Sequence, residues 1–243
     1  MAKSLPNKKR IEALNGLGKR LSYSFRNIAL LETALTHRSY VNENPQLALA
    51  DNERFEFLGD AVLGVCVSDI LIKKYADFSE GTLSKIRAAI VNEKPLAEMA
   101  HKLEIGSCLL LGKGEEISGG RSKDSLLANA FEAVIAAIYL DSGFTKTKSI
   151  LKKLMGPLLN DDSLHSQYFD YKTALQEFCQ KIYKTAPVYI IVDSCGPDHA
   201  KTFDVEVTIA GKVIQTGSGK SKKEAEKQAA QKAWQELHDE DES

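Results

Sequence analysis

The sequence predicts a multi-domain chain, with an all-α domain over residues 1–159 followed by an α+β domain of order α-β-β-β-α over residues 170–238. Residues 1–159 contain successive amphipathic segments with the ~3.6-residue period of helices and no convincing two-residue alternation. By contrast, residues 203–209 alternate apolar and polar side chains, which is the period of a half-buried strand. A polar stretch over residues 160–169 separates the two patterns and is predicted to be a linker.

Capping residues and a proline delimit the helices of the first domain. Asn27 is a good N-cap, and Pro95 stands in the first turn of its helix, where a missing backbone N–H costs least. The glycine-rich, polar segment 112–124 is expected to be a loop. The predicted helices cover residues 8–21, 27–37, 52–74, 79–92, 95–105, 125–141 and 145–155.

The second domain is predicted to pack two helices on one face of an antiparallel sheet. Asp170 and Ser221 are suited to cap its first and last helices, and Ala210 with Gly211 supplies a tight turn between two strands. The acidic residues 239–243 are expected to form a frayed, solvated tail. The helices cover residues 170–183 and 221–237, and the strands lie within 187–194 and 201–219.

Composition places the chain among globular proteins, because 43% of its residues are hydrophobic and 27% are charged. The net charge of −1 does not indicate a nucleic-acid partner, so such a partner would have to be recognised by local patches. The N-terminus shows no signal peptide, and no apolar run reaches the ~20 residues of a membrane span. Cys66 lies in an apolar helix and is interpreted as a reduced core thiol. We therefore expect a cytoplasmic protein without membrane association.

Three acids in the segment 52–74 are spaced for one helix face. Glu53, Glu56 and Asp60 are separated by three, four and seven residues, which are neighbouring positions on a helix. The helix is apolar enough to be largely buried, and a buried stripe of negative charge costs free energy unless something neutralises it. The alternative is an ordinary solvated acidic face.

A second apolar helix carries Asn129 and Glu132, also on one face. Two such helices facing each other would form an oxygen-lined site for a hard cation such as Mg²⁺. The absence of nearby histidine and cysteine disfavours zinc, and it also disfavours a di-iron site built from Glu-x-x-His pairs.

Lysines surround the predicted N-terminus of the last helix, where backbone N–H groups and the helix dipole favour a phosphate group. These lysines are Lys220, Lys222 and Lys223, and His199 is expected to be exposed in the preceding loop 196–199. The alternative is a lysine run that serves solubility alone.

At these motifs the chain resembles bacterial ribonuclease III over nearly its whole length, and its second domain is similar to double-stranded-RNA-binding domains. The matching blocks stand in the family's order. They are THRSY (36–40), NERFEFLGDAVLG (52–64), GTLSKIRAAIVN (81–92), LGKGEEISGGR (111–121) and ANAFEAVIAAIYLD (128–141), then TALQE (173–177), GPDH (196–199) and SKKEAE (221–226).

The resemblance implies a Mg²⁺-dependent endonuclease, with Mn²⁺ as a substitute, that cuts double-stranded RNA to 5′-phosphate and 3′-hydroxyl ends. The implied substrates are rRNA precursors and other structured transcripts, including mRNA and tRNA precursors. Asp60 and Glu132 match catalytic residues, and Glu53 matches a supporting acid. Asn129 stands where many members have Asp. The implied metal ligands are Glu56, Asp60, Asn129 and Glu132.

The resemblance also implies a symmetric homodimer whose two sites face one duplex. Phe57 matches the family's dimer-interface aromatic and is expected to point away from the acidic stripe, with a core phenylalanine as the alternative. Glu226 stands where related domains carry a further lysine. The residues implied to contact RNA are Gln176, His199, Lys220, Lys222 and Lys223.

Two other functions fit parts of the sequence. A non-catalytic double-stranded-RNA-binding protein that retains the nuclease fold is favoured by Asn129 and opposed by the intact carboxylates. A helical metal-storage or scaffold protein would explain the acids, but it lacks the expected histidine ligands.

Overall fold

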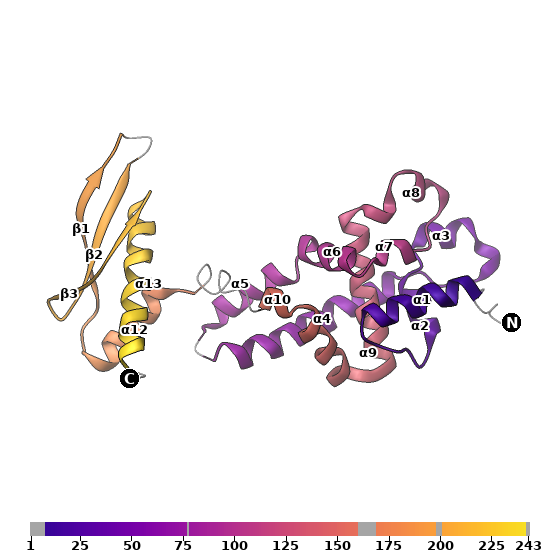
Figure 1. The fold of residues 1–243 in the computed structure, drawn as a ribbon, viewed down its shortest axis with the longest axis horizontal. Coiled ribbons are helices and arrows are strands. Elements are labelled where there is room, and N and C mark those ends of the chain that lie inside the picture. The colour runs from indigo at the N-terminus through magenta and orange to yellow at the C-terminus, as the bar shows by residue number, and fades with distance from the viewer. Residues whose placement is uncertain (1–7, 77, 160–168, 198–200, 242–243) are drawn as a thin grey trace. The chain divides into compact units, whose positions relative to one another are not determined.

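The computed structural model describes residues 8–76, 78–159, 169–197 and 201–241. The chain divides into two compact units, Met1–Tyr168 and Phe169–Ser243. The first unit is helical, whereas the second contains a three-stranded antiparallel sheet and two helices (Figure 1). The predicted fold class, an all-α domain followed by an α-β-β-β-α domain, is therefore confirmed.

The first unit is built around α4 and α9, which pack along each other and contribute much of the core. Cys66, on α4, is a fully buried free thiol, as predicted. The helices are α1 Lys8–Arg20, α2 Ile28–Ala34, α3 Arg38–Glu43, α4 Glu53–Lys74, α5 Glu80–Ile90, α6 Glu93–Lys102, α7 Ile105–Cys108, α8 Lys113–Ile117, α9 Asp124–Leu154 and α10 Gly156–Leu159, with the 3₁₀ turns η1 Pro45–Leu47 and η2 Gly120–Ser122.

The helix predicted over 27–37 begins after Asn27, whose side chain accepts a hydrogen bond from the Ala29 N–H. It ends earlier than predicted because tertiary hydrogen bonds replace helical ones. The Leu110 N–H donates to the Leu35 carbonyl, and the His37 N–H donates to the Leu110 carbonyl. A short parallel bridge thus forms at Thr36, which the helical pattern does not reveal.

The loop predicted over 112–124 was wrong, because this segment contains α8 and η2. Arg121 holds it in place by donating to the carbonyls of Gly106 and Leu109 and by pairing with Glu116 at 2.6 Å. Glycine content indicated a loop, whereas these contacts stabilise short helical turns.

The helices predicted over 125–141 and 145–155 are continuous in α9 except for a break at Gly143, where φ is 77° and ψ is −180°. Only glycine adopts this backbone conformation readily. By length and composition α9 is also the one helix in the described part of the chain that could cross a membrane. Since 56% of its most apolar window is buried within the fold, and core helices of soluble proteins meet the same criterion, this is weak evidence for a span.

Gly59 allows α4 and α9 to approach backbone to backbone. A Cβ atom at Gly59 would lie 1.9 Å from the carbonyl oxygen of Glu132, so no residue other than glycine fits without moving a helix. The two helices are thereby held together at the turn that carries Asp60 on one side and Glu132 on the other.

In the second unit, α12 Tyr171–Ile182 and α13 Lys222–Asp241 cover one face of the sheet (Figure 1). The strands are β1 Val188–Cys195, β2 Thr202–Ile209 and β3 Lys212–Gly219, in the order β1-β2-β3. The buried side chains of Val205, Val207 and Ile209 alternate with partly exposed neighbours, which confirms the predicted strand. Ala210 and Gly211 have φ of 50° and 80°, the left-handed values that two-residue hairpin turns require.

Both predicted caps in this unit are confirmed. Asp170 accepts a hydrogen bond from the Thr173 N–H at 3.2 Å, and the Ser221 hydroxyl accepts one from the Glu224 N–H at 3.2 Å. The predicted tail is wrong in its first residues, because α13 continues to Asp241. Phe169, at the end of the predicted linker 160–169, packs within the second unit, and the rest of that linker lies outside the described residues.

We expect Gly59→Ala to destabilise the first unit by about 3 kcal/mol, the upper end of the cost of overpacking, because the added methyl group meets backbone atoms. Gly64→Ala is the matched control on the same helix. No atom lies within 4 Å of its added Cβ, so the variant should gain about 0.5–1 kcal/mol from helix propensity. Denaturant unfolding of both variants measures the difference, and equal stabilities would contradict the close contact.

Candidate active site

An open pocket of about 450 Å³ lies where α4 and α9 present polar side chains to each other. It gathers the oxygen-bearing residues that the sequence placed on two separate helices. The lining residues are Glu53, Glu56, Phe57, Asp60, Asn129 and Glu132. We call this the acidic pocket; the catalytic and metal-binding roles of its residues stay a prediction.

The acids are less buried than their apolar sequence context indicated. Glu56 and Glu132 are partly buried, whereas Glu53, Asp60 and Asn129 are exposed. The interpretation of a buried acidic stripe was therefore wrong for Glu53 and Asp60. The acids lie at the edge of α4, because its opposite side, which includes Gly59 and Leu63, takes up the contact with the core.

Electrostatic repulsion is concentrated at the two partly buried carboxylates. Burial, reinforced by the nearby charges of Asp60 and Glu56, raises the pKa of Glu132 to about 7. Burial and the charge of Glu53 also raise the pKa of Glu56, while a hydrogen bond with Asn129 opposes this rise. The metal-free pocket thus resists full ionisation, and a cation bound there would relieve the repulsion.

Glu53 differs from the other acids because it has its own cation. Arg38, on α3, donates to the Glu53 carboxylate at 2.8 Å in an exposed ion pair. This pairing favours a supporting role for Glu53 over direct metal binding. Arg38 was not predicted as a site residue, although its place in the THRSY block was the available signal.

The start of α4 is tied to the end of α2 by Asn52, which is buried. Its backbone N–H donates to the Thr36 carbonyl at 2.9 Å, and its side-chain amide donates to the Ala34 carbonyl at 3.3 Å. Glu53 and Glu56 therefore stand in a fixed first helical turn, where the helix dipole also favours negative charge.

The donor set of the acidic pocket fits a hard cation, because it offers three carboxylates free of Arg38 and one amide oxygen. Among the described residues, no three histidine, cysteine, aspartate or glutamate side chains are close enough together to enclose a metal ion as they stand. Mg²⁺ does not require such a cage, because it keeps several waters and binds through few carboxylates together with substrate phosphates. The pocket therefore suits Mg²⁺ better than zinc or an all-protein calcium cage.

Phe57 is 80% exposed, which excludes the alternative of a core phenylalanine. It lines the acidic pocket, so the expectation that it points away from the acidic stripe was wrong. At about 100° per helical residue, Phe57 and Asp60 are only about 60° apart around α4.

In the second unit, Gln176 is exposed on α12, and Lys220, Lys222 and Lys223 are exposed where α13 begins. His199 lies outside the described residues. The ammonium of Lys222 stands 6.0 Å from the centre of the Phe203 ring.

Lys201 joins these lysines although the sequence did not indicate it. Its ammonium stands 5.8 Å from the same Phe203 ring, and Phe203 pairs with Gly219 just before α13. Acidic neighbours limit the patch: the Glu224 carboxylate accepts from the Lys220 N–H at 2.9 Å, and Glu226 pairs with Lys172 at 2.7 Å. The helix start is therefore shared between its own carboxylate and any phosphate.

Comparison with known proteins agrees with both units. The family model described as Ribonuclease-III-like matches residues 27–158, and the model described as Double-stranded RNA binding motif matches residues 171–237. A protein named Ribonuclease 3 from Syntrophobacter fumaroxidans is 49% identical over 229 residues, which are 93% of each chain. A second Ribonuclease 3, from Bacillus velezensis, is 47% identical and covers 93% of this chain and 90% of its own.

The first unit also matches solved structures. The nuclease domain of ribonuclease III from Campylobacter jejuni is 40% identical, with a TM-score of 0.56, and the match covers 65% of this chain and 99% of that domain. The family models and the curated relatives together span nearly the whole chain, in the order that the sequence motifs predicted. The chain therefore belongs to the ribonuclease III family, with a nuclease domain followed by a double-stranded-RNA-binding domain.

Proposed function

We propose that this protein is an Mg²⁺-dependent endonuclease that hydrolyses double-stranded RNA to 5′-phosphate and 3′-hydroxyl ends. The observation that carries the metal proposal is the meeting of Glu56 and Asp60 from α4 with Asn129 and Glu132 from α9 in one pocket. Membership of the ribonuclease III family supports the reaction class. Precursors of rRNA and other structured transcripts are the substrates we propose.

The ligands proposed for the ion are Glu56, Asp60, Asn129 and Glu132. When bound, Mg²⁺ would activate a water and stabilise negative charge on the scissile phosphate and the departing oxygen. The chain's own contribution is position, because Gly59 holds α4 against the backbone of Glu132 and both acids stand on rigid helices. Asn129 hydrogen-bonds with Glu56 and so orients that carboxylate toward the pocket.

The second domain would bring the duplex to this pocket by recognising its shape and backbone. Double-stranded-RNA-binding domains contact 2′-hydroxyl and phosphate groups over about 16 base pairs and read little sequence. Lys201, Lys222 and Lys223 provide exposed charge for the phosphates. Glu224 and Glu226 lower the local charge, so we expect moderate affinity that depends strongly on salt.

An exposed apolar stripe on α4 supports the proposed homodimer. Phe57, Val65 and Ile72 are 80%, 58% and 62% exposed, and they fall within about 80° of one another around the helix. Such a stripe on a soluble protein marks an interaction surface. A second copy seated on it would cover Phe57 at the margin of the acidic pocket, so the dimer interface would form part of the pocket's wall. The related Campylobacter jejuni domain is described as having a region involved in dimer formation.

We expect Glu132→Gln to abolish cleavage of long duplex RNA in Mg²⁺ while leaving duplex binding within about twofold. The reason is that Glu132 serves the metal, whereas the lysines that contact phosphates lie in the second domain. A cleavage time course and a gel-shift titration in chelator measure the two properties. If binding and cleavage fall together in a folded variant, Glu132 has a structural role instead.

The same variant has a stability readout that does not depend on activity. Because the pKa of Glu132 rises from 4.5 to about 7 on folding, the native state binds more protons than the unfolded state between these values. Metal-free wild type should therefore lose stability as pH rises through this window, and Glu132→Gln should not. At pH 8 the variant should be more stable by on the order of 2 kcal/mol, and at pH 4 the two should converge. Parallel pH dependences would show that Glu132 does not carry the repulsion.

Asn129→Asp should lower the Mg²⁺ concentration needed for half-maximal cleavage, because charge count tunes the affinity of hard-cation sites. It should also destabilise the metal-free protein, since the new carboxylate repels Glu56 and Glu132. At saturating Mg²⁺ the two rates should agree within about tenfold, a barrier difference of ~1.4 kcal/mol. An inactive natural protein beside an active variant would instead favour the non-catalytic RNA binder.

We expect Val65→Glu to raise the dissociation constant of the dimer at least 100-fold, about 2.7 kcal/mol, because it places a charge in the apolar stripe of α4. Sedimentation equilibrium of the full chain measures this. Ile117→Glu is the matched control, since Ile117 is 87% exposed on α8, away from the stripe. A wild-type monomer, or equal effects of the two substitutions, would refute the proposed interface.

A further inference from the structure

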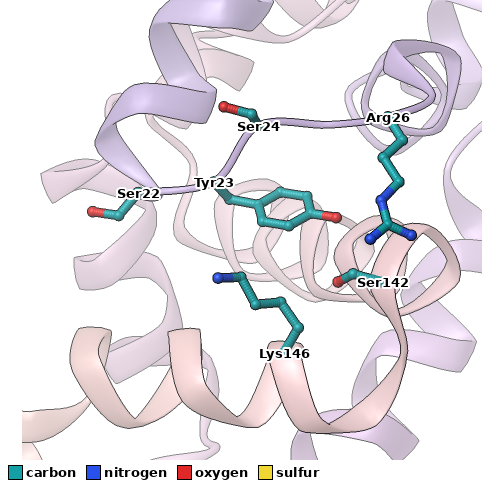
Figure 2. A pocket seen from close by; sticks show the side chains of 6 residues that line it. All are labelled: Ser22, Tyr23, Ser24, Arg26, Ser142 and Lys146. Atoms are coloured by element: carbon teal, nitrogen blue, oxygen red, sulfur yellow. The ribbon is translucent and has the colours of Figure 1, made fainter.

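A second pocket in the nuclease domain lies apart from the acidic pocket and has the opposite charge. It has a volume of about 540 Å³ and opens between the segment that joins α1 to α2 and the middle of α9 (Figure 2). Its lining is polar and contains no acid. The lining residues are Ser22, Tyr23, Ser24, Arg26, Ser142 and Lys146.

Asp141 anchors one wall of this pocket. Its carboxylate accepts hydrogen bonds from the Tyr23 hydroxyl at 2.5 Å and from the backbone N–H groups of Arg26 and Asn27 at 2.9 Å each. Both carboxylate oxygens are therefore engaged by the joining segment. The anchor fixes the backbone of Arg26 and leaves its guanidinium out of these bonds.

The charged side chains that line the pocket are both cations. Within the described ranges, neither Arg26 nor Lys146 forms an ion pair with an acid. A third cation, Lys153, donates to the Ser22 hydroxyl at 2.9 Å. Three positive charges thus stand against the single negative charge of Asp141.

Figure 2 shows how the two lining cations are arranged. The ammonium of Lys146 lies on the Ser22 side of the Tyr23 ring, whereas the guanidinium of Arg26 extends toward Ser142 on the other side. The break at Gly143 separates Ser142 from Lys146 on α9 and lets both face the same hollow. The pocket therefore has a cation at each end and hydroxyl groups beside each cation.

We infer that this pocket binds phosphate groups, two at a time, through Arg26 and Lys146. Guanidinium and ammonium groups are the usual phosphate ligands, and serine hydroxyls add neutral donors that also suit ribose. Cations at opposite ends favour two linked phosphates over one small anion. Consecutive phosphates of an RNA strand and the diphosphate of a free nucleotide share this chemistry; the RNA source rests on the proposed function, and the nucleotide source does not.

The test compares the full chain with the double variant Arg26→Gln, Lys146→Gln in chelator, so that the acidic pocket holds no metal. The matched control removes two exposed lysines of α6, by Lys94→Gln and Lys102→Gln. One arm titrates a nucleoside 5′-diphosphate by calorimetry. The other arm titrates duplex RNA over a range of salt concentrations.

We expect the pocket variant to bind at least one probe tenfold or more weakly than the control. Loss in the RNA arm, with a log–log salt slope reduced by ~0.9 for each lost phosphate contact, identifies the RNA strand as the source. Loss in the nucleotide arm identifies a free nucleotide. Binding equal to the control in both arms overturns the inference. Lys146→Gln alone provides a milder variant if the double variant unfolds.

Cleavage in Mg²⁺, measured in parallel, keeps the two proposals separate. The proposed function fails if the wild-type chain does not cleave duplex RNA. The pocket inference fails if wild-type and variant chains bind both probes alike, whether or not they cleave.

Discussion

The nuclease domain depends on one close contact, the packing of Gly59 of α4 against the backbone of Glu132 in α9. The core of the domain lies along these two helices, so their separation sets how well it packs. The same contact places Asp60 beside Glu132 and concentrates negative charge in a partly buried pocket. Packing therefore favours the short distance and electrostatics opposes it, and packing prevails because a cation can neutralise the acids but nothing can replace the lost core.

The double-stranded-RNA-binding domain uses glycine in the same way. A Cβ atom at Gly217 of β3 would lie 2.3 Å from the backbone nitrogen of Ala229 and 2.4 Å from the carbonyl oxygen of Ala225, so α13 sits directly on the strand. Gly219 is similarly close to Ala225. This packing sets the start of α13 beside β2, which brings Lys222 near Phe203 and Lys201. In both domains a helix backbone lies against a glycine, and the functional side chains follow from that contact.

Much of the fold could be predicted because its signals are local. Asn27, Asp170 and Ser221 each cap the helix that they precede, and the alternation over residues 203–209 identifies β2. The acidic residues could be assigned to two helix faces by spacing alone. Tertiary contacts explain what could not be predicted: Arg121 stabilises short helical turns in a glycine-rich segment, Arg38 reaches Glu53 from another helix, and Lys201 approaches Lys222 only through strand pairing.

The near-zero net charge of the chain conceals opposite local fields, and their separation matters for a phosphate-rich substrate. Two unit charges 4 Å apart interact by about 4 kcal/mol at an effective dielectric constant of 20. Ionised acids in the acidic pocket would therefore repel the phosphate that they must act on. Cations at a distance, such as Lys222 and Lys223, can attract the duplex without cancelling the charge that holds a metal. Binding and reaction are thus assigned to separate surfaces of one chain, and a cation in the acidic pocket is what makes the second compatible with the first.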